Sequence, residues 1–238
     1  MEAVRLSSEV LASKGHIFPA TTADVHLVAD LADGREVHGE TQISSSRLPI
    51  VRLRLVPDEC LPLPGALEAI KAADVITIGP GSLYTSIVPN LLVQKVSEAI
   101  GAARATKIFI GNLMTQPGET DGYGFWEHLN IVRTYAPQIR FDYAILNDRA
   151  ISSEQAELYR ADGAFQILLE DGSTTTQNGS RIEVVRADLL DKSEMVRHDS
   201  ARLAEVVIAC AANDRARRLA VAEGFSQNRP LDAINLGQ

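Results

Sequence analysis

A glycine- and hydroxyl-rich turn follows a short apolar stretch near the centre of this 238-residue chain. Residues 74–78 are β-branched and apolar, residues 79–82 read Gly-Pro-Gly-Ser, and Thr85 and Ser86 add two hydroxyls. Glycines allow backbone angles that a side chain forbids, and a turn between a strand and a helix presents backbone N–H groups to anions. The run therefore indicates a phosphate site. The alternative is a capped strand–helix turn that holds no ligand.

A second polar loop, at residues 111–123, also follows an apolar stretch and precedes a helical pattern. It contains Asn112, Thr115, Gln116 and Glu119, followed by Thr120 and Asp121. A loop this long between regular elements is usually functional. The alternative is an elaborate helix N-cap by Thr120 or Asp121. Because both loops follow successive strands, we expect them to open on one crevice.

Two further side chains are candidates for ligand contacts. Arg197 precedes the last helical pattern and could clamp a phosphate or carboxylate with two hydrogen bonds, or simply lie beside a cap formed by Asp199 or Ser200. Tyr159 could stack on a base or sugar, or close its helix. No histidine pair has zinc spacing. His128 is the histidine best placed for a site contact.

The sequence patterns around these residues predict an α/β fold. We expect strands at 75–78, 107–110 and 141–146, and helices at 65–73, 91–102, 121–135 and 152–160. This alternation is typical of a Rossmann-like, mostly parallel sheet with flanking helices. Residues 24–56 instead predict a small β-hairpin insertion, with strands at 25–28, 37–43 and 50–56 around Asp33-Gly34.

The ends of the chain carry separate expectations. Residues 1–14 predict a helix, and residues 165–186 predict strands interrupted by a polar stretch. We expect one domain over residues 1–212, closed by an amphipathic helix that contains Val206 and Cys210. The polar residues 213–238 predict a loosely ordered C-terminal tail.

Composition narrows the function classes. A net charge of −8 argues against a general nucleic-acid or anionic-membrane binder. No apolar run approaches the roughly 20 residues of a membrane span. Two distant cysteines give no disulfide framework, and no signal peptide is visible. We therefore expect a cytoplasmic protein.

The loop motifs, together with residues 11–21, 88–92 and 197–198, resemble the gluconeogenesis factor family, which is related to 2-phospho-L-lactate transferase. The resemblance implies a Rossmann-like fold, binding of UDP-N-acetylglucosamine, and a role in carbon partitioning and cell-wall morphogenesis. The resemblance implies ligand-binding residues in both loops, in the helix at 152–160 and before the last helix. Together with the other residues of the first turn they are Gly79, Pro80, Gly81, Ser82, Tyr84, Thr85, Ser86, Asn112, Thr115, Glu119, Thr120, Asp121, Gly122, Tyr159 and Arg197.

The family's opening Gly-Gly-Gly-Thr-Gly turn and its later acidic stretch are not found in this sequence. We interpret the chain as a fragment, a product of a misplaced start or a degenerate paralogue, and we expect a homo-oligomer because one flank of the sheet would be open. Three functions follow: a non-catalytic nucleotide-sugar-binding regulator, a phosphotransferase that uses Mg²⁺, and an inactive remnant. The only acidic pair near the crevice is Glu119/Asp121, so an enzyme is the less favoured interpretation.

Overall fold

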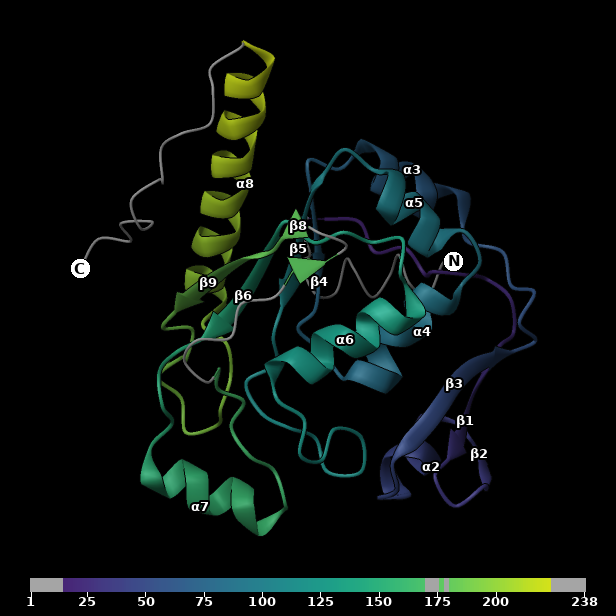
Figure 1. Ribbon diagram of the computed structural model, residues 1–238. Coiled ribbons are helices and arrows are strands. Elements are labelled where there is room, and N and C mark those ends of the chain that lie inside the picture. The colour runs from purple at the N-terminus through teal and green to yellow at the C-terminus, as the bar shows by residue number, and fades with distance from the viewer. Residues whose placement is uncertain (1–14, 170–175, 178–179, 224–238) are drawn as a thin grey trace.

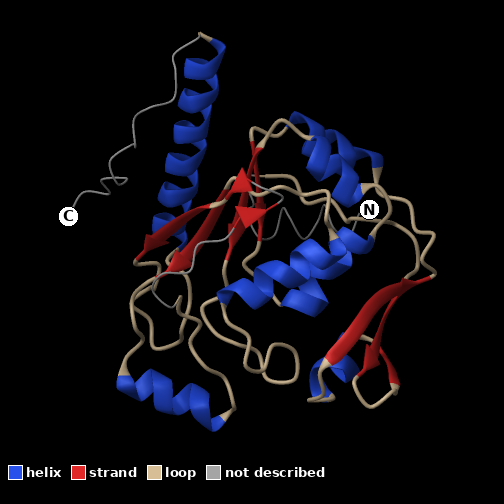
Figure 2. Ribbon diagram, viewed as in Figure 1, coloured by secondary structure: helices blue, strands red, loops and turns tan. Residues whose placement is uncertain are grey.

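A four-stranded parallel sheet forms the centre of the computed structural model, which describes residues 15–169, 176–177 and 180–223. The strand order is β4 (Val75–Ile78), β5 (Thr106–Ile110), β6 (Tyr143–Asn147) and β9 (Glu183–Ala187), and every neighbouring pair is parallel. Helices flank this sheet (Figures 1 and 2). The predicted Rossmann-like α/β class is confirmed.

Side chains alternate between the two faces of the sheet, as the pleat requires. Ile108, Ile110 and Ile145 lie on the face covered by α8 (Ser200–Ala222). Phe109, Ala144 and Leu146 belong to the larger core on the other face, which includes the buried face of α6 (Phe125–Tyr135). Both faces of the central strands are therefore buried, which explains their nearly continuous apolar sequence.

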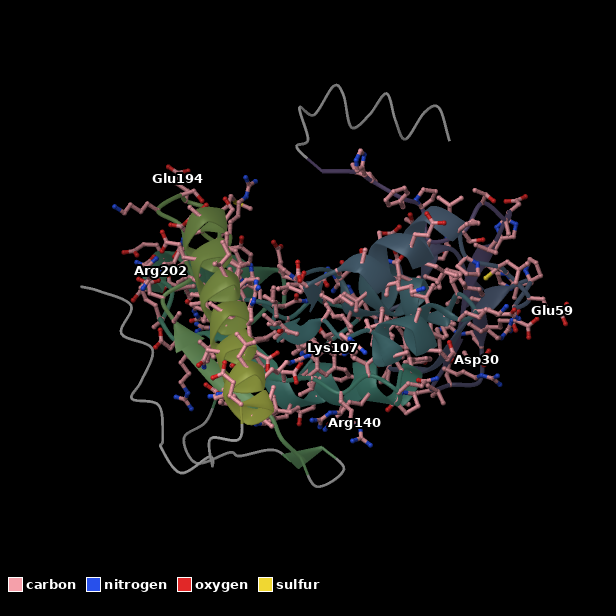
Figure 3. All side chains as sticks on the ribbon, turned by 90° about the horizontal axis from the view of Figure 1, so that it is seen from above. Asp30, Glu59, Lys107, Arg140, Glu194 and Arg202 are labelled. Atoms are coloured by element: carbon pink, nitrogen blue, oxygen red, sulfur yellow. The ribbon has the colours of Figure 1, made fainter. Side chains whose placement is uncertain are left out.

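The predicted hairpin insertion is confirmed as a second, antiparallel sheet. β1 (His26–Leu31) pairs with β2 (Glu36–His38) on one side and with β3 (Ile50–Val56) on the other. Gly34 has φ 85°, as the tight turn after Asp33 requires. Seen from above, Asp30 on β1 and Arg202 on α8 mark opposite ends of the molecule (Figure 3).

Two details of this insertion differ from the sequence prediction. The strand expected over residues 37–43 ends at His38, and α2 (Glu40–Ser45) follows Gly39, whose φ is 82°. Regular strand alternation predicts Val51 on the same face as the buried Leu53 and Leu55, but Val51 is 69% exposed. The register shifts there, because Asp30 pairs with Arg52 while Leu31 pairs with Ile50. The bulge leaves Val51 unpaired and turns it outward.

The helices between β4 and β5 are more broken than predicted. After α3 (Pro64–Ala72), the β4 strand leads into a π-helical turn, η1 (Leu83–Ile87), and then α4 (Val88–Leu92). The predicted helix over residues 91–102 is interrupted, because Lys95 has φ 64° and α5 covers only Val96–Ala102.

Other element boundaries also differ. The helix expected from residue 121 begins at Phe125, where Gly124 donates to Glu127 at 2.9 Å. In the segment expected as strands, residues 165–169 are irregular; the described strands there are the short β7 (Thr176–Gln177) and β8 (Ser180–Arg181), and β9. α7 (Ser153–Ala161) lies close to its predicted range.

The final helix corrects the prediction for the C-terminus. α8 runs to Ala222, so residues 213–222 are helical rather than part of a loose tail. Polar anchoring explains the extension: Thr106 donates to Asp214 at 2.6 Å, and Arg217 pairs with Glu183 at 2.6 Å. The helix predicted over residues 1–14 lies outside the described residues. None of the described helices is long and apolar enough to cross a membrane.

Candidate functional site

The two polar loops emerge at the same edge of the parallel sheet. β4 ends at Ile78 and β5 at Ile110, and the strands are in register, with Ile78 opposite Phe109. Gly79 has φ 89°, and a Cβ placed there would lie 2.5 Å from the Ile110 carbonyl oxygen. Only glycine fits this position, so the first loop crosses directly over the end of the neighbouring strand.

Hydrogen bonds tie the two loops to each other. The Asn112 amide makes a reciprocal pair with the backbone of Gly81: its oxygen accepts from the Gly81 N–H at 3.1 Å, and its nitrogen donates to the Gly81 carbonyl at 2.8 Å. Gln116 Nε2 donates to Ser82 Oγ at 2.7 Å. The loops therefore form one rigid unit, and the expectation that they converge is confirmed.

This unit forms one wall of a cavity of about 460 Å³, which we call the loop pocket. Tyr159 from α7 and Arg197 and His198 from the segment before α8 complete the lining. The residues predicted for ligand binding that line the loop pocket are Pro80, Gly81, Ser82, Asn112, Thr115, Tyr159 and Arg197. Segments far apart in the sequence thus meet at one edge of the sheet, where such folds bind ligands.

Arg197 and Tyr159 play different parts in this lining. The Tyr159 hydroxyl accepts a hydrogen bond from the Val196 N–H at 3.0 Å, which fastens α7 to the segment that carries Arg197. Arg197 is exposed, and its guanidinium makes no hydrogen bond or ion pair with the residues that the structure describes. Its donors are free for an anion, and a guanidinium matches the geometry of two phosphate oxygens.

The other predicted residues do not line the loop pocket. They lie on the far side of the two loops, or at their outer turns: Gly79, Tyr84, Thr85, Ser86, Glu119, Thr120, Asp121 and Gly122. Tyr84 is 1% exposed, and its hydroxyl lies 3.0 Å from that of Tyr123. Burial raises the pKa of Tyr84, so the phenol stays neutral and serves the core.

Glu119 links three parts of the chain. One carboxylate oxygen accepts from Ser44 Oγ in α2 at 2.7 Å and from Thr85 Oγ1 in η1 at 3.2 Å. The residue is buried, with 6% exposed. Glu119 therefore holds the small antiparallel sheet, the first loop and the second loop together.

The remaining polar residues of the second loop shape its turns. Thr120 Oγ1 accepts from the Gln116 N–H at 2.8 Å, and Asp121 accepts from the Gly118 N–H at 2.7 Å. Thr115 Oγ1 accepts from the Phe165 N–H at 2.9 Å, which joins the loop to the segment after α7. The N-cap predicted as an alternative role for Thr120 or Asp121 is wrong, since Gly124 precedes α6.

Four predicted residues remain, and they also lie outside the lining of the loop pocket. Gly79 and Thr85 are fixed as described above, Ser86 is exposed, and Gly122 has φ 71° at an open turn. His128, 2% exposed, contacts the Gly124 carbonyl through Nδ1 at 2.8 Å. Burial lowers the pKa of His128, so this histidine stays neutral in the core and outside the pocket.

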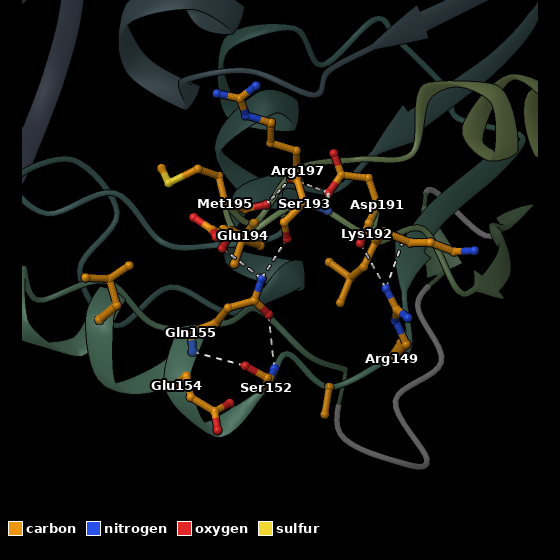
Figure 4. A pocket seen from close by; sticks show the side chains of 14 residues that line it. Arg149, Ser152, Glu154, Gln155, Asp191, Lys192, Ser193, Glu194, Met195 and Arg197 are labelled. Carbon is orange, nitrogen blue, oxygen red and sulfur yellow. Dashed lines mark hydrogen bonds between the residues drawn. The ribbon is translucent and has the colours of Figure 1, made fainter.

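A second cavity, of about 630 Å³, adjoins the loop pocket and shares Val196 and Arg197 with it (Figure 4). It lies between the start of α7 and residues 190–197, and we call it the α7 pocket. Gln155 Nε2 donates to the carbonyls of Ser193 and Glu194, at 3.3 and 3.0 Å, and holds this wall. Sequence reasoning missed this cavity, because nothing in the sequence pairs α7 with that segment.

A divalent metal, which the resemblance to a transferase would imply, does not fit these residues. The described residues contain no group of three His, Cys, Asp or Glu side chains able to hold a metal ion. Glu119 is buried among hydroxyl donors, and Asp121 is exposed at an outer turn. We derive no reaction step through a metal.

Comparison with known proteins identifies relatives of this chain. The profile of the family described as 2-phospho-L-lactate transferase CofD matches residues 1–190. A putative gluconeogenesis factor of Thermotoga maritima is 42% identical over 210 residues, covering 87% of this chain and 65% of the relative. The gluconeogenesis factor of Bacillus subtilis is 37% identical over 207 residues, covering 87% and 64%.

The relatives are longer than the matched region. A putative gluconeogenesis factor of a Nostoc species is 40% identical over 87% of this chain, yet only 45% of that relative is covered. A crystal structure of a Bacillus halodurans protein superposes with a TM-score of 0.79 at 33% identity, covering 87% of this chain and 66% of that one. The family match, the identities and the shared fold together show that the chain belongs to the CofD family, among relatives named gluconeogenesis factors.

Proposed function

We propose that this chain is a gluconeogenesis factor that binds a nucleotide sugar, UDP-N-acetylglucosamine, without transforming it, and that it regulates carbon partitioning and cell-wall morphogenesis. The observation that carries the binding proposal is the free guanidinium of Arg197 opposite two hydrogen-bonded loops across a cavity of about 460 Å³. A cavity of this size is typical of small-molecule sites.

The chemistry of the pocket suits a diphosphate. Arg197 supplies the charge, while Ser82 supplies a hydroxyl next to backbone amides of the first loop. The Ser82 carbonyl accepts hydrogen bonds from the N–H groups of both Ser86 and Ile87. The hydrogen bonds of η1 therefore start at Ser82. Because η1 and α4 are short, a helix dipole contributes little, and the positive charge for the anion comes from Arg197.

The transferase alternative has weaker support. Moving a phosphoryl-linked group in such a pocket calls for a cation to neutralise the developing charge. The described residues offer no acidic cluster to hold one. Binding without chemistry is therefore the function that this pocket favours.

The test is thermal unfolding in the presence of UDP-N-acetylglucosamine, with and without Mg²⁺. A ligand that binds only the native state adds about 2.7 kcal/mol at a hundredfold excess over Kd, so the melting temperature should rise without metal. Arg197→Ala should abolish the rise. Arg160→Ala is the matched control, because Arg160 is an exposed arginine on α7 that lines neither cavity.

Each other outcome favours a different function. A rise that requires Mg²⁺ and is accompanied by product would favour the phosphotransferase. No rise at any ligand concentration would favour an inactive remnant. An equal rise in wild type and Arg197→Ala would show that the arginine is not part of the binding site.

A further inference from the structure

Two hydrogen-bonding atoms in the lining of the loop pocket have no partner among the described residues. They are Oε1 of Gln116 and Nε2 of His198, and both are shielded from water. Folded proteins rarely leave such atoms unsatisfied, because each costs the desolvation free energy of a polar group. Other such atoms occur outside the cavity, at Glu119 and His128 for example, but Gln116 and His198 line the same cavity, which points to a ligand that satisfies them.

The Gln116 side chain keeps its carbonyl oxygen without a partner among the described residues. Its amide nitrogen donates to Ser82 Oγ at 2.7 Å, and its backbone N–H donates to Thr120 Oγ1 at 2.8 Å. The side-chain carbonyl oxygen can only accept a hydrogen bond, and the amide nitrogen keeps a second N–H beside it.

His198 is left with an acceptor in the same way. Its imidazole interacts with the backbone of Gly111 in a way that favours the protonated ring, and the Gly111 N–H already donates to the Ile145 carbonyl at 2.9 Å. The ring must therefore donate to the Gly111 carbonyl. Burial lowers the pKa of His198 and keeps the ring neutral. A neutral imidazole with one N–H carries a lone pair on its other nitrogen, here Nε2.

We propose that Gln116 and His198 read the sugar of the bound nucleotide sugar, each accepting a hydrogen bond from a hydroxyl or amide N–H next to the diphosphate. This inference rests on the proposed function. Two acceptors disfavour a phosphate oxygen at this position, while the adjacent Arg197 attracts one. The pocket thus separates a part that binds the anion from a part that recognises donors.

Shielding makes this recognition selective. A site built to hydrogen-bond a donor discriminates strongly against a ligand that lacks it, because the buried acceptor then stays unpaired. The glycosyl group of UDP-N-acetylglucosamine carries hydroxyls and an amide N–H, whereas UDP lacks that group. We expect wild type to bind UDP-N-acetylglucosamine more tightly than UDP, and we expect Gln116 and His198 to account for the difference.

The experiment compares the affinities for UDP-N-acetylglucosamine and UDP by isothermal titration calorimetry. His198→Phe and Gln116→Met keep the size of the side chain and remove the acceptor. Each should weaken UDP-N-acetylglucosamine about tenfold, equivalent to losing one hydrogen bond to a buried group, and His198→Phe, which leaves the bond between Gln116 and Ser82 in place, should leave UDP within about twofold. His198→Gln retains an acceptor and should restore part of the preference. His26→Phe, an exposed histidine on β1, is the matched control.

The outcomes separate this inference from the proposed function. If wild type binds neither compound, the proposed function fails. If wild type binds both and the two variants lose both equally, these residues hold the diphosphate and the inference is overturned. An unchanged preference in both variants also overturns it. If one variant does not fold, judged by its melting temperature without ligand, the other single variant decides the question.

Discussion

The two sides of the paired loops are built from the same kinds of residues but use them differently. On the pocket side, the Arg197 guanidinium makes no hydrogen bond or ion pair with the described residues, and Gln116 keeps an oxygen that has no partner among them. On the anchored side, which does not line the loop pocket, Thr85 and Glu119 bond to other segments and Thr120 bonds within its own loop, although Oε2 of Glu119 also has no partner among the described residues. Polar density therefore marks both loops as structured, whereas unpaired groups that also line a cavity, Arg197 and Gln116, mark the side that we expect to meet a ligand.

The largest expected effect tests how tightly the anchored side is packed. Gly118 has φ 85°, and a Cβ there would collide with the Ser44 carbonyl oxygen of α2. Gly118→Ala should lower the free energy of unfolding by about 3 kcal/mol or more, because backbone strain and a backbone clash add. Urea denaturation measures the change.

Gly122→Ala is the control for this substitution. Gly122 lies in the same loop with φ 71°, but nothing lies within 4 Å of the added Cβ. Only the left-handed conformation opposes the substitution, so we expect a loss of about 1 kcal/mol. Equal losses in the two variants would show that the loop is not pressed against α2.

The next prediction tests a single hydrogen bond on the anchored side. Thr120→Val keeps the shape of a side chain that is 0% exposed, and removes the oxygen that accepts from the Gln116 N–H. The free energy of unfolding should fall by about 1–3 kcal/mol, because a buried donor is left unpaired. Ser86→Ala, at an exposed position of the first loop, should stay within about 0.5 kcal/mol.

The smallest expected effect concerns pH. Burial holds the pKa of His128 below its ordinary value of 6.5 in the folded chain. Below pH 6.5 the unfolded chain takes up a proton that the folded chain does not, so stability is present above that pH and is lost as the pH falls. The contribution is at most about 1.4 kcal/mol per pH unit.

His128→Asn isolates this contribution, because it replaces the titrating ring by a neutral amide. Denaturation curves between pH 5 and pH 7 should depend less steeply on pH for the variant than for wild type. If the free energy of unfolding depends on pH equally in the two proteins, His128 does not titrate as an isolated buried histidine. Water would then reach His128 more readily than its burial indicates.

The fold was largely predictable, because strands and helices differ in the spacing of their apolar residues along the sequence. The apolar residues of β4, β5 and β6 and the hairpin around Asp33-Gly34 indicate their elements directly. The interruptions within these elements were not predictable, because they depend on backbone geometry. The left-handed Lys95 and the bulge at Val51 leave no composition signal. Likewise, the extension of α8 depends on contacts such as Thr106–Asp214 that join distant positions.

The site was predictable only in part. Glycine and hydroxyl content located both loops, and the order of strands placed them at one edge. Which side of a loop each residue faces is a tertiary property, so Tyr84 and Glu119 were grouped with Ser82 although they lie on the anchored side. His198 could have been singled out as the neighbour of Arg197, but its free nitrogen is visible only once Gly111 is seen to hold the other one.

The contact between Gly118 and Ser44, with Glu119 beside it, has a practical consequence for shortening or grafting this protein. The antiparallel insertion, residues 26–56, forms a separate sheet and could be taken for a segment that can be removed. Excising it would strip the Ser44 hydroxyl from Glu119 and open the back of the second loop. A trimmed version intended to keep the ligand cavity must therefore retain the insertion, even though its strands never pair with the central sheet.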